Sequence, residues 1–301
     1  MKRIGYYPER KTGPLLDAFI NGFHHTLGPQ RLGMEAMATF MRLPKGASVK
    51  PSKVGGVPCE VISGMEDENQ RTILYLHGGG YCTCSARTHR FIVAILCRAA
   101  RARAIILDYR LAPEHPFPAA LEDATAAYCH LLEQGVDPRC LALAGDSAGG
   151  GLCMALMLAI AKTKAPLPAA AYLMSPWMDL TPSRRPFYLF PQLREDFADR
   201  VADRMASLYT RDHNPSHPYI SPLYGDFSGL PPLLVTAGKH EPLRKDAALL
   251  AQRAAQAGVN VTFEPYYGPV HVAQGLAGIS TGAARLLGRG GRFIRNHCPG
   301  D

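Results

Sequence analysis

The stretch Leu-Ala-Gly-Asp-Ser-Ala-Gly-Gly-Gly at residues 143–151 decides the fold, because it contains the G-x-S-x-G pattern around Ser147. An apolar run at residues 140–144 precedes it, and a longer apolar run at residues 152–161 follows. A strand, a sharp turn and a helix would place Ser147 at the apex of the turn, where a Cβ on the flanking glycines would clash. The pattern alone also fits a glycine-rich turn that only packs, but the flanking strand and helix favour a nucleophile.

Length and composition favour one large α/β domain, or one domain with a small addition. The chain has 301 residues, of which 47% are hydrophobic and 19% charged, as in ordinary globular enzymes. It contains no apolar run long enough for a transmembrane helix, and residues 1–10 lack the apolar core of a secretory signal. Its eight cysteines form no C-x-x-C pair, which favours buried thiols and a reducing, cytoplasmic setting.

The net charge of +8 raises the question of an anionic partner. The basic residues form no aromatic-interleaved patch and no known nucleic-acid reader motif. The densest cluster comprises Arg285, Arg289, Arg292 and Arg295, at the spacing of a solvated helix face. We therefore expect no nucleic-acid partner.

Short apolar segments alternate with amphipathic ones after residue 57, which predicts a mostly parallel central sheet flanked by helices. The expected strands are residues 57–62, 72–76, 104–107, 140–144, 169–174, 233–237 and 259–263. The expected helices are residues 120–132, 152–161, 243–257 and 273–287.

Two regions fall outside this alternation. Residues 1–50 carry helical patterns at 15–23 and 34–41, and residues 181–218 contain only Pro-rich loops and one helix-like stretch, 197–209. We expect both regions to form a cap over the carboxyl ends of the strands, although the insertion could also be a surface excursion. The predicted core then comprises residues 51–180 and 219–301.

A serine nucleophile needs a base, and the base needs an acid. In this strand–turn–helix arrangement the chain order is nucleophile, acid, base. His271 is the expected base, because it follows the last predicted strand and the only later histidine, His297, lies near the terminus.

The expected acid is the first carboxylate after the strand at residues 233–237, which is Glu241. Asp246 is the alternative, but it falls inside the following helix. His240 adjoins Glu241 and points the opposite way in an extended segment, so we interpret it as structural.

An oxyanion needs converging N–H donors, and His77-Gly-Gly-Gly-Tyr81 directly follows the strand at residues 72–76. The amides of Gly78 and Gly79, with that of Ala148, are the expected oxyanion hole. A glycine-rich loop could instead bind phosphate, but no G-K-[ST] or dinucleotide context follows it.

Together with Asp108-Tyr-Arg-Leu-Ala-Pro-Glu114 and Ser175-Pro-Trp-Met-Asp-Leu-Thr181, these motifs resemble the hormone-sensitive-lipase-like family of α/β-hydrolase esterases. The resemblance covers about residues 71–275. It implies a Ser/acid/His triad, a helical cap, small and fairly hydrophobic ester substrates and a possible homodimer. It also implies that the Asp108 stretch braces the oxyanion loop and that Asp179 anchors the cap entrance.

The chain departs from the family pattern at three positions. Glu241 stands where Asp is more common, and Pro269 and Ala273 replace a Met and an aromatic residue around the histidine. The triad is unaffected, but an inherited substrate preference is not implied.

The sequence thus predicts a carboxylesterase for short- to medium-chain esters that uses no metal and no cofactor. A lactonase, deacetylase or amidase could use the same triad. A non-catalytic small-molecule receptor is a further alternative, since the plant gibberellin receptor resembles this family. That receptor has lost the triad histidine, so the presence of His271 argues against this alternative.

Overall fold

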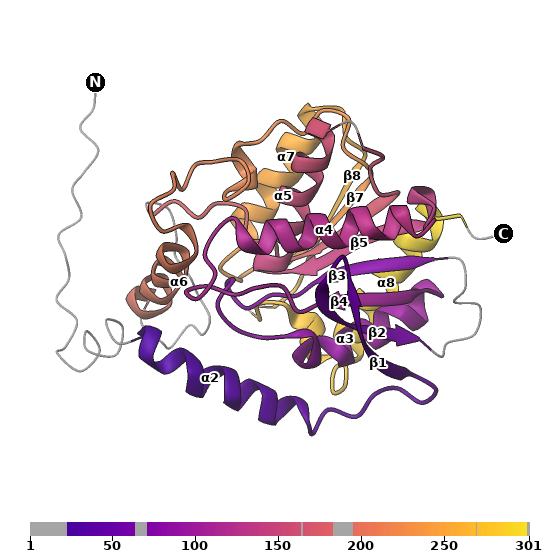
Figure 1. Ribbon diagram of the computed structural model, residues 1–301, viewed down its shortest axis with the longest axis horizontal. Helices are drawn as coiled ribbons and strands as arrows, with labels where there is room; N and C mark the ends of the chain where they lie inside the picture. Colours follow the sequence, from indigo (N-terminus) through magenta and orange to yellow (C-terminus); the bar gives the residue numbers. More distant parts are fainter. Residues whose placement is uncertain (1–22, 64–70, 164, 183–194, 269, 300–301) are drawn as a thin grey trace.

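The computed structural model describes residues 23–63, 71–163, 165–182, 195–268 and 270–299, and it contains an eight-stranded sheet (Figure 1). The strand order is β1-β2-β4-β3-β5-β6-β7-β8. The β1–β2 and β2–β4 pairs are antiparallel, and every pair from β4 to β8 is parallel. The bounds are β1 (Ser48–Val54), β2 (Val57–Ser63), β3 (Thr72–Leu76), β4 (Arg103–Leu107), β5 (Leu141–Asp146), β6 (Ala170–Met174), β7 (Leu233–Gly238) and β8 (Val261–Tyr266).

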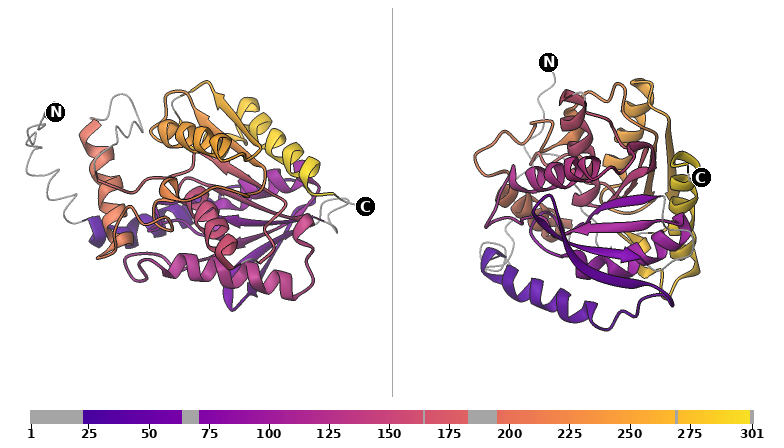
Figure 2. Two further views of the ribbon diagram at one scale, coloured as in Figure 1. Left: turned by 90° about the horizontal axis from the view of Figure 1, so that it is seen from above. Right: turned by 45° about the vertical axis from the view of Figure 1, so that its right-hand side comes forward.

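Helices cover both faces of the sheet, as the alternation predicts (Figures 1 and 2). Leu74 and Leu76 of β3 pack in one apolar cluster with α4, α5 and α7, whereas Ile73 and Tyr75 pack in the other with α3 and α8. The α/β fold expected from the sequence is therefore confirmed. The helix bounds are α2 (Phe23–Ala38), α3 (Ala86–Ala100), α4 (Ala119–Glu133), α5 (Ala148–Thr163), α6 (Glu195–Thr210), α7 (Arg244–Gln256) and α8 (Thr281–His297).

The remaining two helices, α2 and α6, lie beside each other at one end of the sheet (Figure 2). A Cβ built at Gly80 would lie 2.3 Å from Sδ of Met205 in α6, and Arg31 of α2 donates to the carbonyl oxygen of Cys82. Both helices therefore pack against the loop that follows β3. Within the described ranges, none of the helices has the length and apolarity needed to cross a membrane.

The expected strands are present, with ends shifted by a few residues, but β1 and α3 were not predicted. β1 reads Ser-Val-Lys-Pro-Ser-Lys-Val and is an edge strand with mostly exposed side chains, so it carries no apolar run. The expected closing helix at 273–287 is present as α8, but its predicted start was wrong by eight residues. Ala273–Leu276 form a separate 3₁₀ turn, and Ser280 caps α8 by accepting a hydrogen bond from the amide of Ala283.

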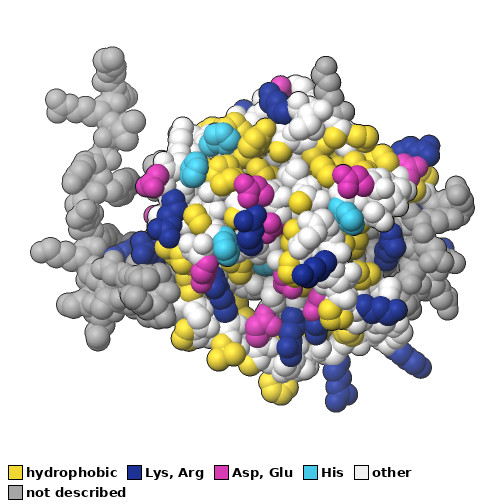
Figure 3. Space-filling view, in the orientation of Figure 1, with side chains coloured by type: hydrophobic (Ala, Val, Ile, Leu, Met, Phe, Trp, Pro, Cys, Tyr) yellow, Lys and Arg dark blue, Asp and Glu magenta, His cyan; other side chains and the backbone are white. Residues whose placement is uncertain are grey.

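Other expectations fall partly outside the described residues. Residues 15–22 of the first helical pattern and residues 183–194 of the insertion lie outside them, whereas the expected helix at 197–209 corresponds to α6. The arginine cluster lies on α8 with Arg285, Arg289 and Arg292 exposed, as predicted for a solvated helix face. In the view of Figure 3, Lys and Arg side chains are interspersed with Asp and Glu.

Candidate active site

Ser147 lies at the turn between β5 and α5 with a φ of 52°, in the left-handed region. The backbones are close enough there that only glycine fits at two neighbouring positions. A Cβ at Gly149 would lie 1.9 Å from the carbonyl oxygen of Leu76, and one at Gly145 would lie 2.6 Å from that of Gly149. The amide of Ser147 donates to the carbonyl oxygen of Met174 at 2.8 Å. The strained turn is thus held by steric contact and by β6.

His271, from the loop after β8, reaches the hydroxyl of this serine. Its Nε2 lies 2.9 Å from Oγ of Ser147. A proton can pass between these two atoms without any rearrangement of the chain. The structure therefore brings together residues that are 124 positions apart in the sequence.

Glu241, just after β7, lies on the other side of the imidazole. Its Oε2 is 3.4 Å from Nδ1 of His271, and the residue is only 4% exposed. Asp246 lies in the first turn of α7, where its Oδ2 accepts hydrogen bonds from the amides of Met178 and Asp179. Of the two carboxylates considered from the sequence, Glu241 is the one beside the histidine.

Two hydroxyl groups that the sequence analysis missed join the glutamate to the histidine loop. Ser175 donates from Oγ to Oε2 of Glu241 at 2.8 Å and accepts from the amide of Val272 at 3.4 Å. The hydroxyl of Tyr266 lies 3.4 Å from the same Oε2 and donates to the carbonyl oxygen of Val270 at 3.1 Å. Burial raises the pKa of Tyr266 well above its usual value, so this phenol keeps its proton.

In the loop after β3, the structure differs from the prediction made for Gly78. The amide of Gly78 donates to Oδ1 of Asp146 at 3.0 Å, so its single N–H is already used. The expectation that Gly78 helps to form an oxyanion hole is therefore wrong. Among the described residues, none accepts a backbone hydrogen bond from the amides of Gly79, Gly80 or Ala148. The His-Gly-Gly-Gly run alone does not tell which of its amides stay without an acceptor.

Asp146 is the centre of a buried polar cluster behind this loop. Its Oδ1 accepts from the hydroxyl of Tyr75 at 2.8 Å and lies 3.3 Å from Nε2 of His89. Burial opposes both charges, but their mutual attraction and hydrogen bond still raise the pKa of His89 and lower that of Asp146. By contrast, burial, reinforced by His89, lowers the pKa of His77 to about 3, so the imidazole of His77 is neutral.

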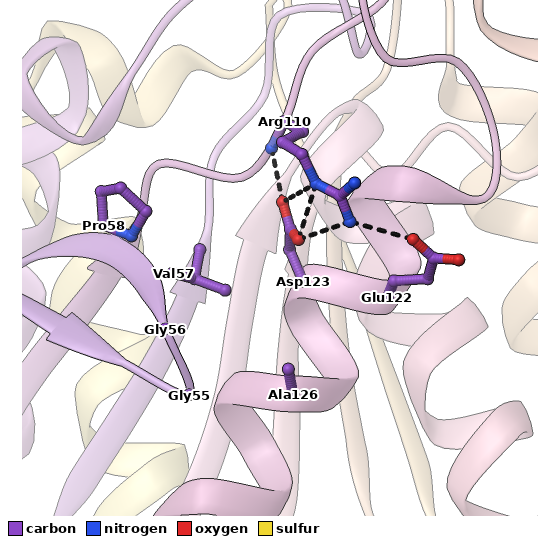
Figure 4. Close-up of a pocket in the computed structure, with 8 residues that line it drawn as sticks. All are labelled: Gly55, Gly56, Val57, Pro58, Arg110, Glu122, Asp123 and Ala126. Carbon is purple, nitrogen blue, oxygen red and sulfur yellow. Dashed lines mark hydrogen bonds and ion pairs between the residues drawn. The ribbon is translucent and has the colours of Figure 1, made fainter.

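The expected brace under this loop is present. Tyr109 donates from its hydroxyl to the carbonyl oxygen of His77 at 2.6 Å, and the two rings stack. Arg110 pairs with Asp123 and Glu122 on α4, in a surface pocket formed with the β1–β2 turn (Figure 4). Because two carboxylates already occupy the guanidinium, we interpret this pocket as part of the brace.

Asp179, the expected anchor of the cap entrance, forms side-chain contacts with two residues outside helix α6. Its Oδ1 accepts from the amide and hydroxyl of Thr181, and its Oδ2 accepts from the hydroxyl of Tyr224. In the part of the chain that the structure describes, no group of three or more His, Cys, Asp or Glu side chains is placed to hold a metal ion.

The arrangement has the parts that acyl transfer requires. A serine hydroxyl contacts an imidazole, the imidazole contacts a carboxylate, and the amide of Ala148, next to the serine, has no acceptor among the described residues. The roles expected of Ser147, His271 and Glu241 stay predictions at this point.

Comparisons with known proteins agree with this fold. Residues 73–275 match the profile of a family described as having the alpha/beta hydrolase fold. An acetyl-hydrolase of Streptomyces hygroscopicus is 44% identical over 230 residues, which cover 76% of each chain. An esterase of Acinetobacter venetianus is 34% identical over 222 residues, or 73% of each chain. The crystal structure of an esterase from the bacterial hormone-sensitive lipase family superposes with a TM-score of 0.86 and 39% identity, covering 96% of this chain and 100% of that one.

Proposed function

The chain belongs to the hormone-sensitive-lipase-like esterases of the α/β-hydrolase family, and we propose that it hydrolyses short- to medium-chain carboxylic esters through a Ser147–His271–Glu241 triad. It is a carboxylic ester hydrolase by this membership. The observation that carries the proposed triad is the contact of Nε2 of His271 with Oγ of Ser147 at 2.9 Å, with Glu241 on the opposite ring nitrogen.

The reaction proceeds in two halves. Oγ of Ser147 attacks the acyl carbon while Nε2 of His271 takes the hydroxyl proton. The amides of Gly79, Gly80 and Ala148 bind the oxyanion, and the imidazolium returns its proton to the departing alcohol. Water, activated by the same imidazole, then adds to the acyl-enzyme and releases the acid and the serine.

Glu241 holds the imidazole in the tautomer whose Nε2 is free to accept the proton, and its charge stabilises the imidazolium that forms. Its own position depends on Ser175, which bonds the same carboxylate oxygen that faces the histidine. The two hydroxyl contacts therefore support the role proposed for this glutamate.

The proposed size of the acyl group rests on one relative. That relative, with 44% identity, is named an acetyl-hydrolase, which favours the short end of the range.

Three further features are part of the proposal. Residues 1–50 and 181–218 would form the cap, as the packing of α2 and α6 on the loop after β3 supports. The eight cysteines are free thiols, which supports a reducing, cytoplasmic location. A homodimer is proposed by family resemblance alone.

Hydrolysis of p-nitrophenyl esters from acetyl to long acyl chains, with Ser147→Ala in parallel, tests this function. We expect a rate maximum at short or medium chains, and a loss of several orders of magnitude in kcat in a folded Ser147→Ala variant. Activity within tenfold of the parent in that variant would reject the nucleophile. Turnover confined to lactones or amides would change the substrate class but keep the triad, and a folded protein silent on every substrate would favour the receptor alternative.

A further inference from the structure

Arg31 and Glu35 of helix α2 point toward the protein. Arg31 donates to both carboxylate oxygens of Glu114 and to the carbonyl oxygens of Cys82 and Ala112. One turn later, Glu35 accepts a hydrogen bond from the hydroxyl of Ser85. The charged side of this helix is therefore used to attach it to the loop that follows the oxyanion segment.

The opposite side of α2, which faces solvent, is apolar. Leu32 is 72% exposed and Met37 is 73% exposed, and Phe40, directly after the helix, is 85% exposed. Gly28, Pro29, Gly33, Met34, Ala36 and Thr39 are also exposed, and none of them is charged. A surface helix normally shows the reverse pattern, with its charges in water and its apolar stripe on the core.

Positive charge continues along the chain from this apolar side. Residues 36–59 contain four basic residues and no acidic one. Arg42, Lys45, Lys50 and Lys53 are all exposed, the last two on the edge strand β1. Figure 3 shows hydrophobic side chains along the lower edge of the molecule, where α2 lies in Figure 1, and Lys and Arg side chains projecting from the same edge.

We propose that the outer side of α2 and the segment up to Lys53 form a docking surface for an anionic lipid surface. Exposed Met and Phe side chains insert into the headgroup boundary, and flanking Lys and Arg side chains bind acidic headgroups. The protein lies on the bilayer and does not cross it. This proposal does not depend on which residues perform the hydrolysis.

The positive charge of this surface favours an anionic lipid surface over a second copy of the chain as its partner. In a two-fold contact through α2, the basic segment of one copy would face the basic segment of the other, with no acidic residue in 36–59 to compensate. An anionic lipid surface supplies the missing negative charge. Because Arg31 joins α2 to the carbonyl oxygen of Cys82, docking would place the loop after β3 near the lipid.

Co-sedimentation with vesicles tests the proposal. The full chain is mixed with vesicles of phosphatidylcholine alone, or of phosphatidylcholine with phosphatidylglycerol, at low and high salt. We expect binding only to the vesicles that contain phosphatidylglycerol, with weaker binding at high salt because screening acts on exposed charges.

Variants separate the apolar and the charged contributions. Met37→Ser with Phe40→Ser removes the inserting side chains, and Arg42→Gln with Lys45→Gln removes two charges; each pair should weaken vesicle binding by roughly tenfold or more. Only the Arg42→Gln, Lys45→Gln variant should also make vesicle binding less dependent on the salt concentration. Because the side chains replaced are exposed, the melting temperatures should stay close to that of the parent.

Matched controls lie elsewhere on the molecule. Tyr267→Ser changes an equally exposed side chain, 87%, after β8 at the opposite edge of the sheet. Lys162→Gln with Arg253→Gln removes two exposed charges from α5 and α7. Both controls should bind vesicles like the parent.

Two results would overturn the proposal. One is a parent protein that does not bind vesicles containing phosphatidylglycerol even at low salt. The other is a Met37→Ser, Phe40→Ser variant whose mass by light scattering falls from dimer to monomer while its vesicle binding is unchanged, which would make this side an interface between copies.

Discussion

The nucleophile and the acid–base pair lie side by side but are held in different ways. Ser147 is fixed by backbone contact, since a Cβ at Gly149 would meet the carbonyl oxygen of Leu76 at 1.9 Å. Glu241 and the His271 loop are fixed by side-chain hydroxyl groups, chiefly Oγ of Ser175. The nucleophile turn depends on the absence of side chains at Gly145 and Gly149. The acid–base pair depends on hydrogen bonds between segments that are far apart in the sequence.

This difference decides how each half responds to substitution. A Cβ added at Gly145 or Gly149 would overlap backbone atoms, so such a substitution disturbs the fold itself. A removed hydroxyl at the acid–base side leaves the fold in place and loosens the geometry of two side chains. Substitutions on the two sides should therefore fail differently, by loss of the fold on one side and by loss of rate on the other.

Gly149→Ala should abolish the folded protein and therefore all activity. The new Cβ would overlap the carbonyl oxygens of Leu76 and His77, which belong to β3 and the loop after it. A clash with backbone cannot be relieved by a rotamer change, so a cost above about 4 kcal/mol is expected. The yield of folded protein and the thermal unfolding curve measure this cost.

Gly288→Ala is the matched control, because the nearest atom to its Cβ is a flexible Arg292 nitrogen at 3.8 Å and alanine favours a helix. A Gly149→Ala protein that melts like the parent would show that the turn can relax.

Glu241→Gln should lower kcat by about a thousandfold or more while the protein stays folded. The amide can no longer stabilise the imidazolium and can favour the wrong tautomer of His271. Asp246→Asn is the comparison. Its amide oxygen can still accept from the amides of Met178 and Asp179, so activity should change little even if stability falls. Steady-state kinetics and melting curves for both variants decide the assignment, and the reverse pattern would move the acid to Asp246.

The sequence was informative where the chain itself imposes the geometry. The G-x-S-x-G turn predicts Ser147, because the glycines are a steric requirement visible in the letters. The positions of His271 and Glu241 followed from strand order. The choice of Gly78 over Gly80 failed, because the hydrogen bond from Gly78 to Asp146 exists only after β3 and β5 pair.

The same reasoning explains the other differences. Ser175 gave no signal of its own, because its role depends on contacts with Glu241 and Val272, 66 and 97 positions away. The pattern of Met37 and Phe40 predicted a helix stripe that would ordinarily face the core. In the structure these side chains face solvent, because Arg31 and Glu35 attach the opposite side of α2 to the protein.

Ser175→Ala should lower kcat by roughly tenfold with little change in KM, because substrate contacts are intact and only the orientation of the acid and base is loosened. Tyr266→Phe, which removes a longer contact to the same oxygen, should have a smaller effect. A Ser175→Ala variant with the kcat of the parent would reduce Ser175 to a packing role.

The smallest effect concerns a charged contact on the nucleophile side, between His89 and Asp146. Although burial opposes the charged form, the carboxylate of Asp146 raises the pKa of His89 above the unfolded value of about 6.5. A raised folded-state pKa means that the stabilisation is complete below about pH 6.5 and is lost as the pH rises through the folded-state pKa. His89→Gln keeps a hydrogen-bond donor near Asp146 but cannot titrate. Urea unfolding of both proteins from roughly pH 5 to pH 9 should therefore show a fall in stability in the parent that is absent in the variant. Equal pH slopes in the two proteins would mean that His89 is neutral when folded, and that its contact with Asp146 adds no charge-dependent stability behind the loop after β3.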